Sequence, residues 1–418
     1  MPTRADPPHV VLITAHDLGR HLGCYGIDEV ESPNLDELAD AGVQFQNAVA
    51  TTPVCSPARG SLLTGRYPQS NGLLGLTHSP WWWRLDDGER TLPERLAAHG
   101  YKTHLAGLQH VAPEDDRLGF DHRHAGPRDA AGTAAAAESI FLDADGPTYA
   151  QFGFFETHRP FERDPEGDVH VPAYLEPTEE IRTDLGRFQA EIAYLDERIG
   201  ELLAGLEAAG VREETIIVFA VDHGIPYPGA KWWCRDPGVE IALIMDLPEV
   251  PSQSIDPVVS TVDVVPTILE AIDVPIADNI EGRSLYPYLT DDTEEPPRQA
   301  AFTQFTSAGN EARGVVTEAF TCIRNFGAGR SIAYPVAADP TVRAGENTGD
   351  PRPYAQLYDR TADRANLEDI GGDRPGLVRK LSDDVRRWMA RVDDPLLRGG
   401  IRYPYHERAL ADLHGEEE

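Results

Sequence analysis

The sequence contains continuous apolar runs, rich in valine and isoleucine, that recur through its N-terminal part. A run without polar interruptions predicts a strand buried on both faces, as in a parallel sheet covered by helices. Strand-like runs occupy residues 9–14, 43–48, 101–107, 148–155, 215–221 and 241–245. The run at residues 215–221 is the most strongly strand-like of them.

Segments with helical spacing lie between these runs. Residues 32–42 combine a serine cap with a terminal glycine, and residues 188–206 place apolar side chains on one face. Further helices are expected at residues 91–100, at residues 129–138 on the surface, and at residues 262–271. Strands that alternate with helices predict an α/β fold.

The pattern changes after residues 290–297, a segment rich in proline and acidic residues that is typical of a linker. Short strand-like segments at residues 301–304, 313–317, 320–324 and 356–357 then precede a helical segment at residues 375–392. We expect a large α/β domain at residues 1–295. A small C-terminal subdomain at residues 296–418, an antiparallel sheet with one helix, should pack on it.

Polar residues able to bind metals or move protons come directly after several of the apolar strands. They are His16, Asp17, His110, His158, Asp222 and His223. In an open α/β sheet the ligand crevice lies at the carboxyl ends of the strands. These side chains are therefore expected to share one site.

Residues 52–65 form a second polar and small-residue cluster, which includes Cys55, Pro57 and Arg59. Pro57 fits the first turn of a helix and Gly65 fits a left-handed helix stop, so Cys55 should lie just ahead of a short helix. The unpaired N–H groups of a helix N-terminus suit a tetrahedral oxyanion. Arg59 is one turn further on and could reach the same place.

The run Cys-Ser-Pro-Ala-Arg-Gly-Ser-Leu-Leu-Thr-Gly at residues 55–65, with Asn71-Gly72 after it, resembles the signature of the type I sulfatases of the alkaline phosphatase superfamily. The resemblance implies an alkaline phosphatase-like fold, a mixed and mostly parallel sheet sandwiched by helices. It also implies that a formylglycine-generating enzyme oxidises Cys55 to formylglycine. The hydrate of that aldehyde can attack sulfur with one hydroxyl and expel sulfate by collapsing through the other.

The resemblance assigns roles to the residues at the strand ends. Asp17, Asp222, His223 and His16 would hold a divalent cation. Arg59 would stabilise the nucleophile, His110 would assist collapse of the sulfated intermediate, and Lys231 would grip the sulfate. His158 would touch the sulfate, and either His158 or Lys231 would assist departure of the leaving group.

Two positions depart from the family pattern. Leu108 stands where the family has a sulfate-binding lysine, and His16 stands where it has an aspartate. Calcium is the cation expected for a cage of oxygen ligands, whereas nitrogen from His16 and His223 would favour manganese or zinc. Calcium or magnesium fits if either histidine contacts the sulfate instead.

Residues 71–76 and 110–114 look closest to the heparan N-sulfatase-like branch, which indicates a small sulfated substrate, a sulfate monoester or sulfamate of a sugar. A phosphodiesterase or phosphonate monoester hydrolase of the same superfamily is one alternative. A non-catalytic sulfatase-like binding protein, suggested by Leu108 and His16, is another. The tryptophans at residues 81–83 are interpreted as a packing cluster in preference to a substrate rim.

The net charge is −33, and only three residues are lysines: Lys102, Lys231 and Lys380. Such an acidic, lysine-poor surface suits concentrated salt, so a halophilic source is expected. Nucleic acid is excluded as a partner because no basic face is available. No apolar run is long enough for a membrane span and none at the start is typical of a secretion signal, so we expect no membrane association and a cytoplasmic protein. The sequence does not indicate an oligomeric state.

Overall fold

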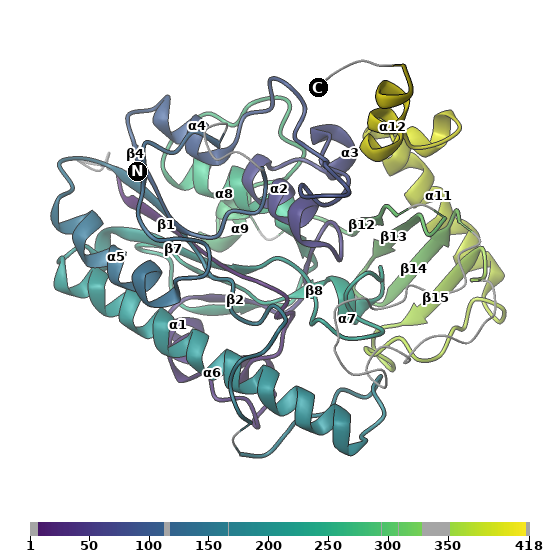
Figure 1. The fold of residues 1–418 in the computed structure, drawn as a ribbon, viewed down its shortest axis with the longest axis horizontal. Coiled ribbons are helices and arrows are strands. Elements are labelled where there is room, and N and C mark those ends of the chain that lie inside the picture. Colours follow the sequence, from purple (N-terminus) through teal and green to yellow (C-terminus); the bar gives the residue numbers. More distant parts are fainter. Residues whose placement is uncertain are drawn as a thin grey trace.

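The computed structural model describes residues 7–112, 118–165, 167–293, 295–307, 309–327 and 352–414. At its centre is an eight-stranded sheet in the order β10-β2-β9-β7-β1-β6-β4-β5 (Figure 1). Its strands are β1 (His9–Ala15), β2 (Val43–Phe45), β4 (Lys102–Gly107), β5 (His122–Arg123), β6 (Thr148–Gly153), β7 (Thr215–Val221), β9 (Leu243–Asp246) and β10 (Gln253–Ile255). Neighbouring strands run parallel except where β9 pairs with β2 and β7.

Strands β1 and β7 form the middle of the sheet and the centre of the main hydrophobic core. Every residue of β7 is buried, as the uninterrupted apolar run predicted. Burying each valine, isoleucine or phenylalanine side chain contributes about 1.5–3 kcal/mol. The two strands pair in register from His9 with Thr215 to Ala15 with Val221, which brings their carboxyl ends side by side.

Helices cover both faces of the sheet, as Figure 1 shows: α1, α5 and α6 on one face, and α2, α4, α8 and α9 on the other. The helices of this part are α1 (Pro33–Ala41), α2 (Cys55–Thr64), α3 (Pro68–Asn71), α4 (Leu92–Ala97), α5 (Ala130–Leu142), α6 (Glu179–Ala208), α7 (Asp236–Val239), α8 (Val264–Ala271) and α9 (Tyr286–Leu289). Helix α5 exposes one face, as expected for a surface helix, and packs its buried face along α6. No helix among the described residues is long and apolar enough to cross a membrane.

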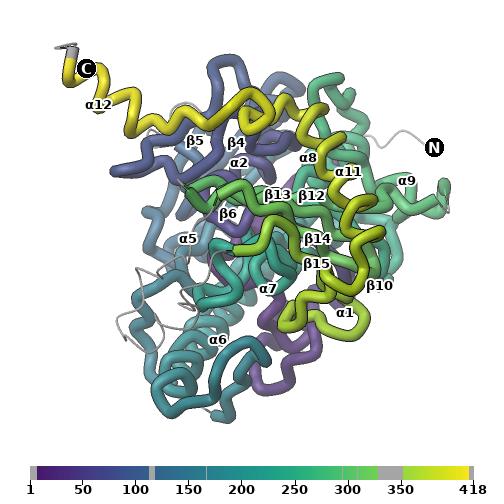
Figure 2. Tube along the Cα trace, turned by 90° about the vertical axis from the view of Figure 1, so that its right-hand side faces the viewer, coloured from purple at the N-terminus to yellow at the C-terminus, as the bar shows by residue number. Residues whose placement is uncertain are grey.

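The C-terminal part contains an antiparallel sheet of β12 (Ala301–Phe305), β13 (Ala312–Val316), β14 (Phe320–Asn325) and β15 (Ala355–Asp359), which helix α11 (Pro375–Arg391) covers (Figure 2). The Trp388 ring of α11 stacks on Phe302 of β12 with centroids 5.2 Å apart, and also packs edge-on against Tyr67. The last helix is α12 (Pro404–His414). A small antiparallel sheet with one covering helix is confirmed, whereas the domain boundary at residue 295 stays a prediction.

Buried ion pairs join the two parts. Arg360, just after β15, donates to Asp236 of α7 at 3.0 Å and also pairs with Glu240. A small three-stranded sheet of β11 (Val259–Ser260), β3 (Ala48–Val49) and β8 (Glu240–Ile241) lies beside β12. The backbone N–H of Gln304 in β12 donates to the carbonyl of Thr51, just after β3. The C-terminal antiparallel sheet is therefore attached through β12 to the residues that precede Cys55.

Candidate active site

The adjacent ends of β1 and β7 place two aspartates against each other. Asp17 follows β1 with a left-handed φ of 47°, which turns its side chain into the site. Its backbone N–H donates to the Oδ1 of Asp222 at 2.9 Å, and Asp222 follows β7 directly. Both carboxylates are buried. The prediction that strand ends bring these residues together is realised in the structure.

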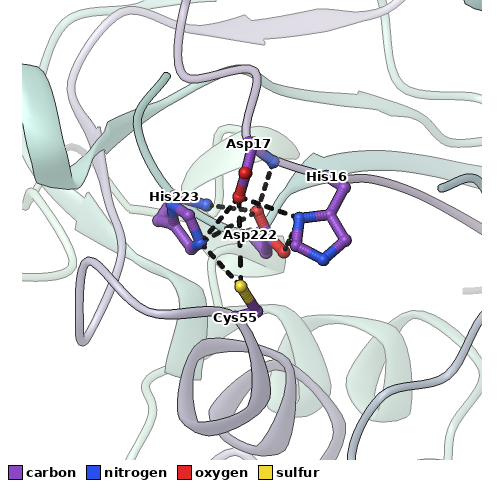
Figure 3. A group of neighbouring side chains, drawn as sticks. All are labelled: His16, Asp17, Cys55, Asp222 and His223. Atoms are coloured by element: carbon purple, nitrogen blue, oxygen red, sulfur yellow. Dashed lines mark hydrogen bonds and ion pairs between the residues drawn. The ribbon is translucent and has the colours of Figure 1, made fainter. Parts of the chain in front are cut away.

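Cys55 is the first residue of α2, one position further into the helix than the sequence suggested, and the helix ends at Gly65 with φ 69°. Figure 3 shows its sulfur directed at the two aspartates and His223. The Sγ lies 3.3 Å from His223 Nε2 and 3.9 Å from Asp17 Oδ1. The side chain of residue 55 therefore shares one small space with the groups at the ends of β1 and β7.

Arg59 lies one turn along α2 and contacts the strands. Its Nε donates to Asp222 Oδ2 at 3.0 Å, and its two terminal nitrogens donate to the Thr14 hydroxyl and the Ala15 carbonyl, each at 3.1 Å. All five guanidinium hydrogens belong to a planar fork, so these contacts fix the orientation of Asp222. The predicted role of Arg59 at the nucleophile stays a prediction.

Lys231 is buried, although lysine is rarely buried without a partner. Its Nζ lies 2.7 and 2.6 Å from the two oxygens of Asp17. The ammonium group thus pairs with the same Asp17 carboxylate that the Cys55 sulfur approaches at 3.9 Å.

Four histidines surround the aspartates. His16 Nδ1 lies 2.9 Å from Asp17 and 3.3 Å from Asp222, and its ring centroid lies 4.6 Å from that of His158 and 5.7 Å from that of His110. His223 Nδ1 bonds to the Gly224 carbonyl at 2.9 Å, so its Nε2 faces the site. The structure therefore brings together every site residue that the sequence proposed.

Leu108 and His78 complete the surroundings of His110. The imidazole of His78 stacks on that of His110 with centroids 5.7 Å apart. His78 was not among the predicted site residues, because it lies in a loop and follows no strand. Leu108, which stands where the family has a lysine, donates its backbone N–H to Gly153 and so joins the ends of β4 and β6.

The cations around residue 55 stabilise negative charge on it. Burial, the largest single effect, raises the pKa of the Cys55 thiol, but Lys231, His16 and His223 together outweigh it and hold the pKa well below its usual range. For His16 burial opposes protonation, but Asp222, Cys55 and Asp17 raise its pKa to about 9. Burial lowers the pKa of His158 to about 3.

The donor set fits a divalent cation. One ligand atom from each of His16, Asp17, Cys55, Asp222 and His223 lies within 4.8 Å of all the others. His16 faces this group with Nδ1, 2.9 Å from Asp17 and 3.3 Å from Asp222, whereas its buried Nε2 points away from the two aspartates (Figure 3). Two carboxylates with imidazoles around them form a site of the kind that binds calcium, manganese or zinc.

A profile of the family described as Sulfatase matches residues 8–274 of the chain. The chain belongs to the sulfatase family, whose members hydrolyse sulfate esters. This match and the relatives confirm the predicted type I sulfatase and therefore an enzyme. Residues 113–114 of the motif that resembles the heparan N-sulfatase-like branch lie outside the described residues.

The relatives include human N-sulphoglucosamine sulphohydrolase, 28% identical over 94% of this chain and 92% of the human protein. An ulvan-active sulfatase of Formosa agariphila is 29% identical over 80% of this chain and 76% of its own length. Among solved structures, BT4656 in complex with its substrate D-glucosamine-2-N,6-O-disulfate has a TM-score of 0.72 at 17% identity, covering 93% of this chain and 99% of that one. The alkaline phosphatase-like fold is thereby confirmed, whereas a halophilic source and a cytoplasmic location stay predictions.

Proposed function

We propose that this sulfatase hydrolyses a sulfate monoester or sulfamate of a sugar, with residue 55 in its formylglycine form as the nucleophile. The observation that carries the proposal is the position of the Cys55 Sγ, 3.3 Å from His223 Nε2 and 3.9 Å from Asp17 Oδ1, at the start of α2. A side chain at this position meets the helix N-terminus, buried cations and a cluster able to hold a metal.

The names of the relatives support a sugar substrate. One relative is named for N-sulphoglucosamine, which carries a sulfamate, and another for the polysaccharide ulvan. The solved structure with D-glucosamine-2-N,6-O-disulfate holds an amino sugar as its substrate. An amino sugar with an N-sulfate is therefore the first substrate to test.

The cation would be held by Asp17, Asp222 and His223, with His16 as a fourth ligand. A bound divalent cation supplies positive charge to a sulfate oxygen and to the hydrate of residue 55. Arg59 keeps Asp222 oriented for this task through its 3.0 Å contact. The carboxylates suit calcium, whereas the two imidazoles favour manganese or zinc.

The chain's own residues position the sulfate and move the protons. A formylglycine hydrate supplies one hydroxyl for attack and a second through which it releases sulfate. Burial lowers the pKa of His110 and the nearby Cys55 opposes that lowering, so a neutral His110 close to residue 55 could accept the proton of that second hydroxyl. His158 Nδ1 contacts the Arg159 carbonyl at 2.6 Å and so carries the hydrogen, which leaves Nε2 an acceptor. The ammonium group of Lys231 would then act as the general acid that protonates the leaving group.

Replacing Lys231 by methionine should lower kcat/KM for a sulfated sugar by about 10²–10³-fold, the usual effect of removing one donor from a developing charge. Steady-state kinetics with sulfate release as the readout measures it. Lys102→Met is the matched control, since Lys102 is half exposed and pairs only with Asp145 in the part of the chain the structure describes. A Lys231→Met enzyme with more than a tenth of the wild-type kcat/KM would contradict the assigned role.

Removing divalent cations with a chelator should abolish turnover, and adding them back should restore it, because the positive charge that the cation would supply to a sulfate oxygen and to the hydrate of residue 55 is lost. We expect His16→Asp, which supplies a third carboxylate, to raise the activity with calcium relative to that with manganese or zinc. Activity of the stripped enzyme with each metal is the measurement. An unchanged metal ranking in His16→Asp would show that His16 is not a ligand.

The proposed function itself is tested by incubating the enzyme with N-sulfoglucosamine, an aryl sulfate and an aryl phosphodiester and measuring sulfate or phenol release. The expected result is preferred hydrolysis of the sulfated sugar. Faster hydrolysis of the phosphodiester would instead favour the phosphodiesterase alternative, in which the same groups act on phosphorus.

A further inference from the structure

A cavity of about 430 Å³ opens beside the site, and half of its lining residues are aromatic. This volume lies within the range of small-molecule pockets, about 300–1,000 Å³. The rings come from three distant parts of the sequence, and the residues that define this aromatic pocket are Trp81, Trp83, Trp232, Tyr403, Tyr405 and His406.

The aromatic pocket adjoins the catalytic residues through the backbone. Val54, which lines the pocket, directly precedes Cys55. Trp232, which follows Lys231, donates its backbone N–H to the Pro53 carbonyl at 3.0 Å. A sulfate held beside Cys55 and Lys231 would therefore carry its attached group into or past this pocket.

A second connection runs through His78. Its imidazole stacks on His110 with centroids 5.7 Å apart and meets the Trp81 ring edge-on at 5.0 Å. Trp81 is 40% exposed, whereas Trp83 is buried. Two of the three tryptophans that the sequence suggested as a packing cluster therefore line the pocket, one from a buried position and one exposed.

The C-terminal segment closes the other side of the pocket. Tyr403 donates its hydroxyl hydrogen to Glu311 at 2.5 Å and packs edge-on against Trp83 with centroids 5.9 Å apart. Arg408 lies over the Trp82 ring, 4.4 Å from its centroid. These contacts hold the start of α12 against the loop at residues 81–83, which brings Tyr405 and His406 to the rim.

The chemistry of the lining fits a sugar ring. Pyranose rings have apolar C–H faces and hydroxyl edges, and tryptophan and tyrosine offer apolar faces with polar ends. Thr306, Ser307 and His406 line the same pocket and supply hydrogen-bonding groups for hydroxyls. A pocket for a lipid chain would lack this polar rim.

We propose that the aromatic pocket binds the sugar from which sulfate is cleaved, and that residues 403–406 are specificity-determining residues contributed by the C-terminal segment. The inference rests on the proposed function, because the sugar is placed by a sulfate held beside residue 55. It adds a binding site formed by side chains outside the catalytic cluster, which consists of His16, Asp17, Cys55, Asp222 and His223.

Trp81→Ala and Tyr405→Ala each test the pocket without changing the catalytic cluster. Loss of one stacking ring should raise KM for N-sulfoglucosamine about tenfold, with kcat within about twofold of wild type. The inhibition constant of inorganic sulfate, which has no sugar, should not change. Tyr354→Ala is the matched control, since Tyr354 is 83% exposed and is not among the residues that line the pocket.

Equilibrium binding separates failure of this inference from failure of the proposed function. Titration calorimetry of N-sulfoglucosamine into Cys55→Ala and into Cys55→Ala/Trp81→Ala needs no turnover. A dissociation constant about tenfold higher in the double variant supports the pocket even if the wild-type enzyme releases no sulfate. Equal dissociation constants for the two variants would overturn the proposed pocket. An equal rise in the dissociation constant caused by Tyr354→Ala would also overturn it. Tyr405 is 55% exposed, so its variant is expected to fold if Trp81→Ala does not.

Discussion

Cys55→Ala should lose sulfate release by about 10⁴-fold or more, the scale found when an enzyme loses its nucleophile. Alanine keeps the helix start but removes the atom that lies 3.3 Å from His223 and 3.9 Å from Asp17. The measurement is turnover of N-sulfoglucosamine at enzyme concentrations high enough to detect residual activity.

Two observations accompany this experiment. Cys24→Ala should keep wild-type activity, because Cys24 lies outside the catalytic cluster, in a short 3-10 helix at Gly23–Tyr25. In active wild-type enzyme the peptide that contains residue 55 should be about 18 mass units lighter than its cysteine form, as expected for formylglycine. Full activity with an unmodified thiol would refute the aldehyde mechanism, and full activity of Cys55→Ala would refute the site itself.

Arg313→Met should destabilise the protein by about 3–5 kcal/mol, the cost of leaving one charge of a buried pair without its partner. Arg313 and Asp394 are both fully buried, and their Nε and Oδ2 atoms lie 2.5 Å apart. Asp394 also accepts a hydrogen bond from Gln69 of the catalytic part at 2.9 Å. Urea unfolding followed by circular dichroism gives the free energy of unfolding.

Arg398→Met provides the comparison for this variant. The Arg398 and Asp393 side chains form an ion pair but are 69% and 67% exposed. Loss of this exposed ion pair should change the free energy of unfolding by no more than about 1 kcal/mol. Arg313→Met/Asp394→Leu, which removes both charges, should recover part of the loss. Equal destabilisation by Arg313→Met and Arg398→Met would show that the buried pair contributes no more to stability than the exposed one.

The central sheet and most of the site could be predicted from sequence because both rest on local patterns. An uninterrupted apolar run identifies β1 and β7, and the polar residues that follow each strand must meet where parallel strands end together. The start of α6 at Glu179 was missed, although Ile181 and Leu185 continue the helical spacing of the later apolar residues, because charged residues surround them.

The rest of the site depends on contacts that no local pattern encodes. The partners of Arg59 are Asp222, 163 residues away, and the end of β1, contacts that the motif around Cys55 did not indicate. The aromatic pocket joins residues 81–83 to residues 403–406, and the latter segment had no motif to draw attention to it. Such pairings follow from tertiary packing alone.

The burial of Cys55, only 2% exposed, would limit when the enzyme that generates the proposed formylglycine can reach it. His223 closes over it and follows it by 168 residues in the chain. During translation at about 5–20 residues per second, the ribosome takes roughly 10–30 s to cover that distance. Oxidation of the thiol would have to be completed on the nascent chain in that interval, or on a chain that has not yet folded.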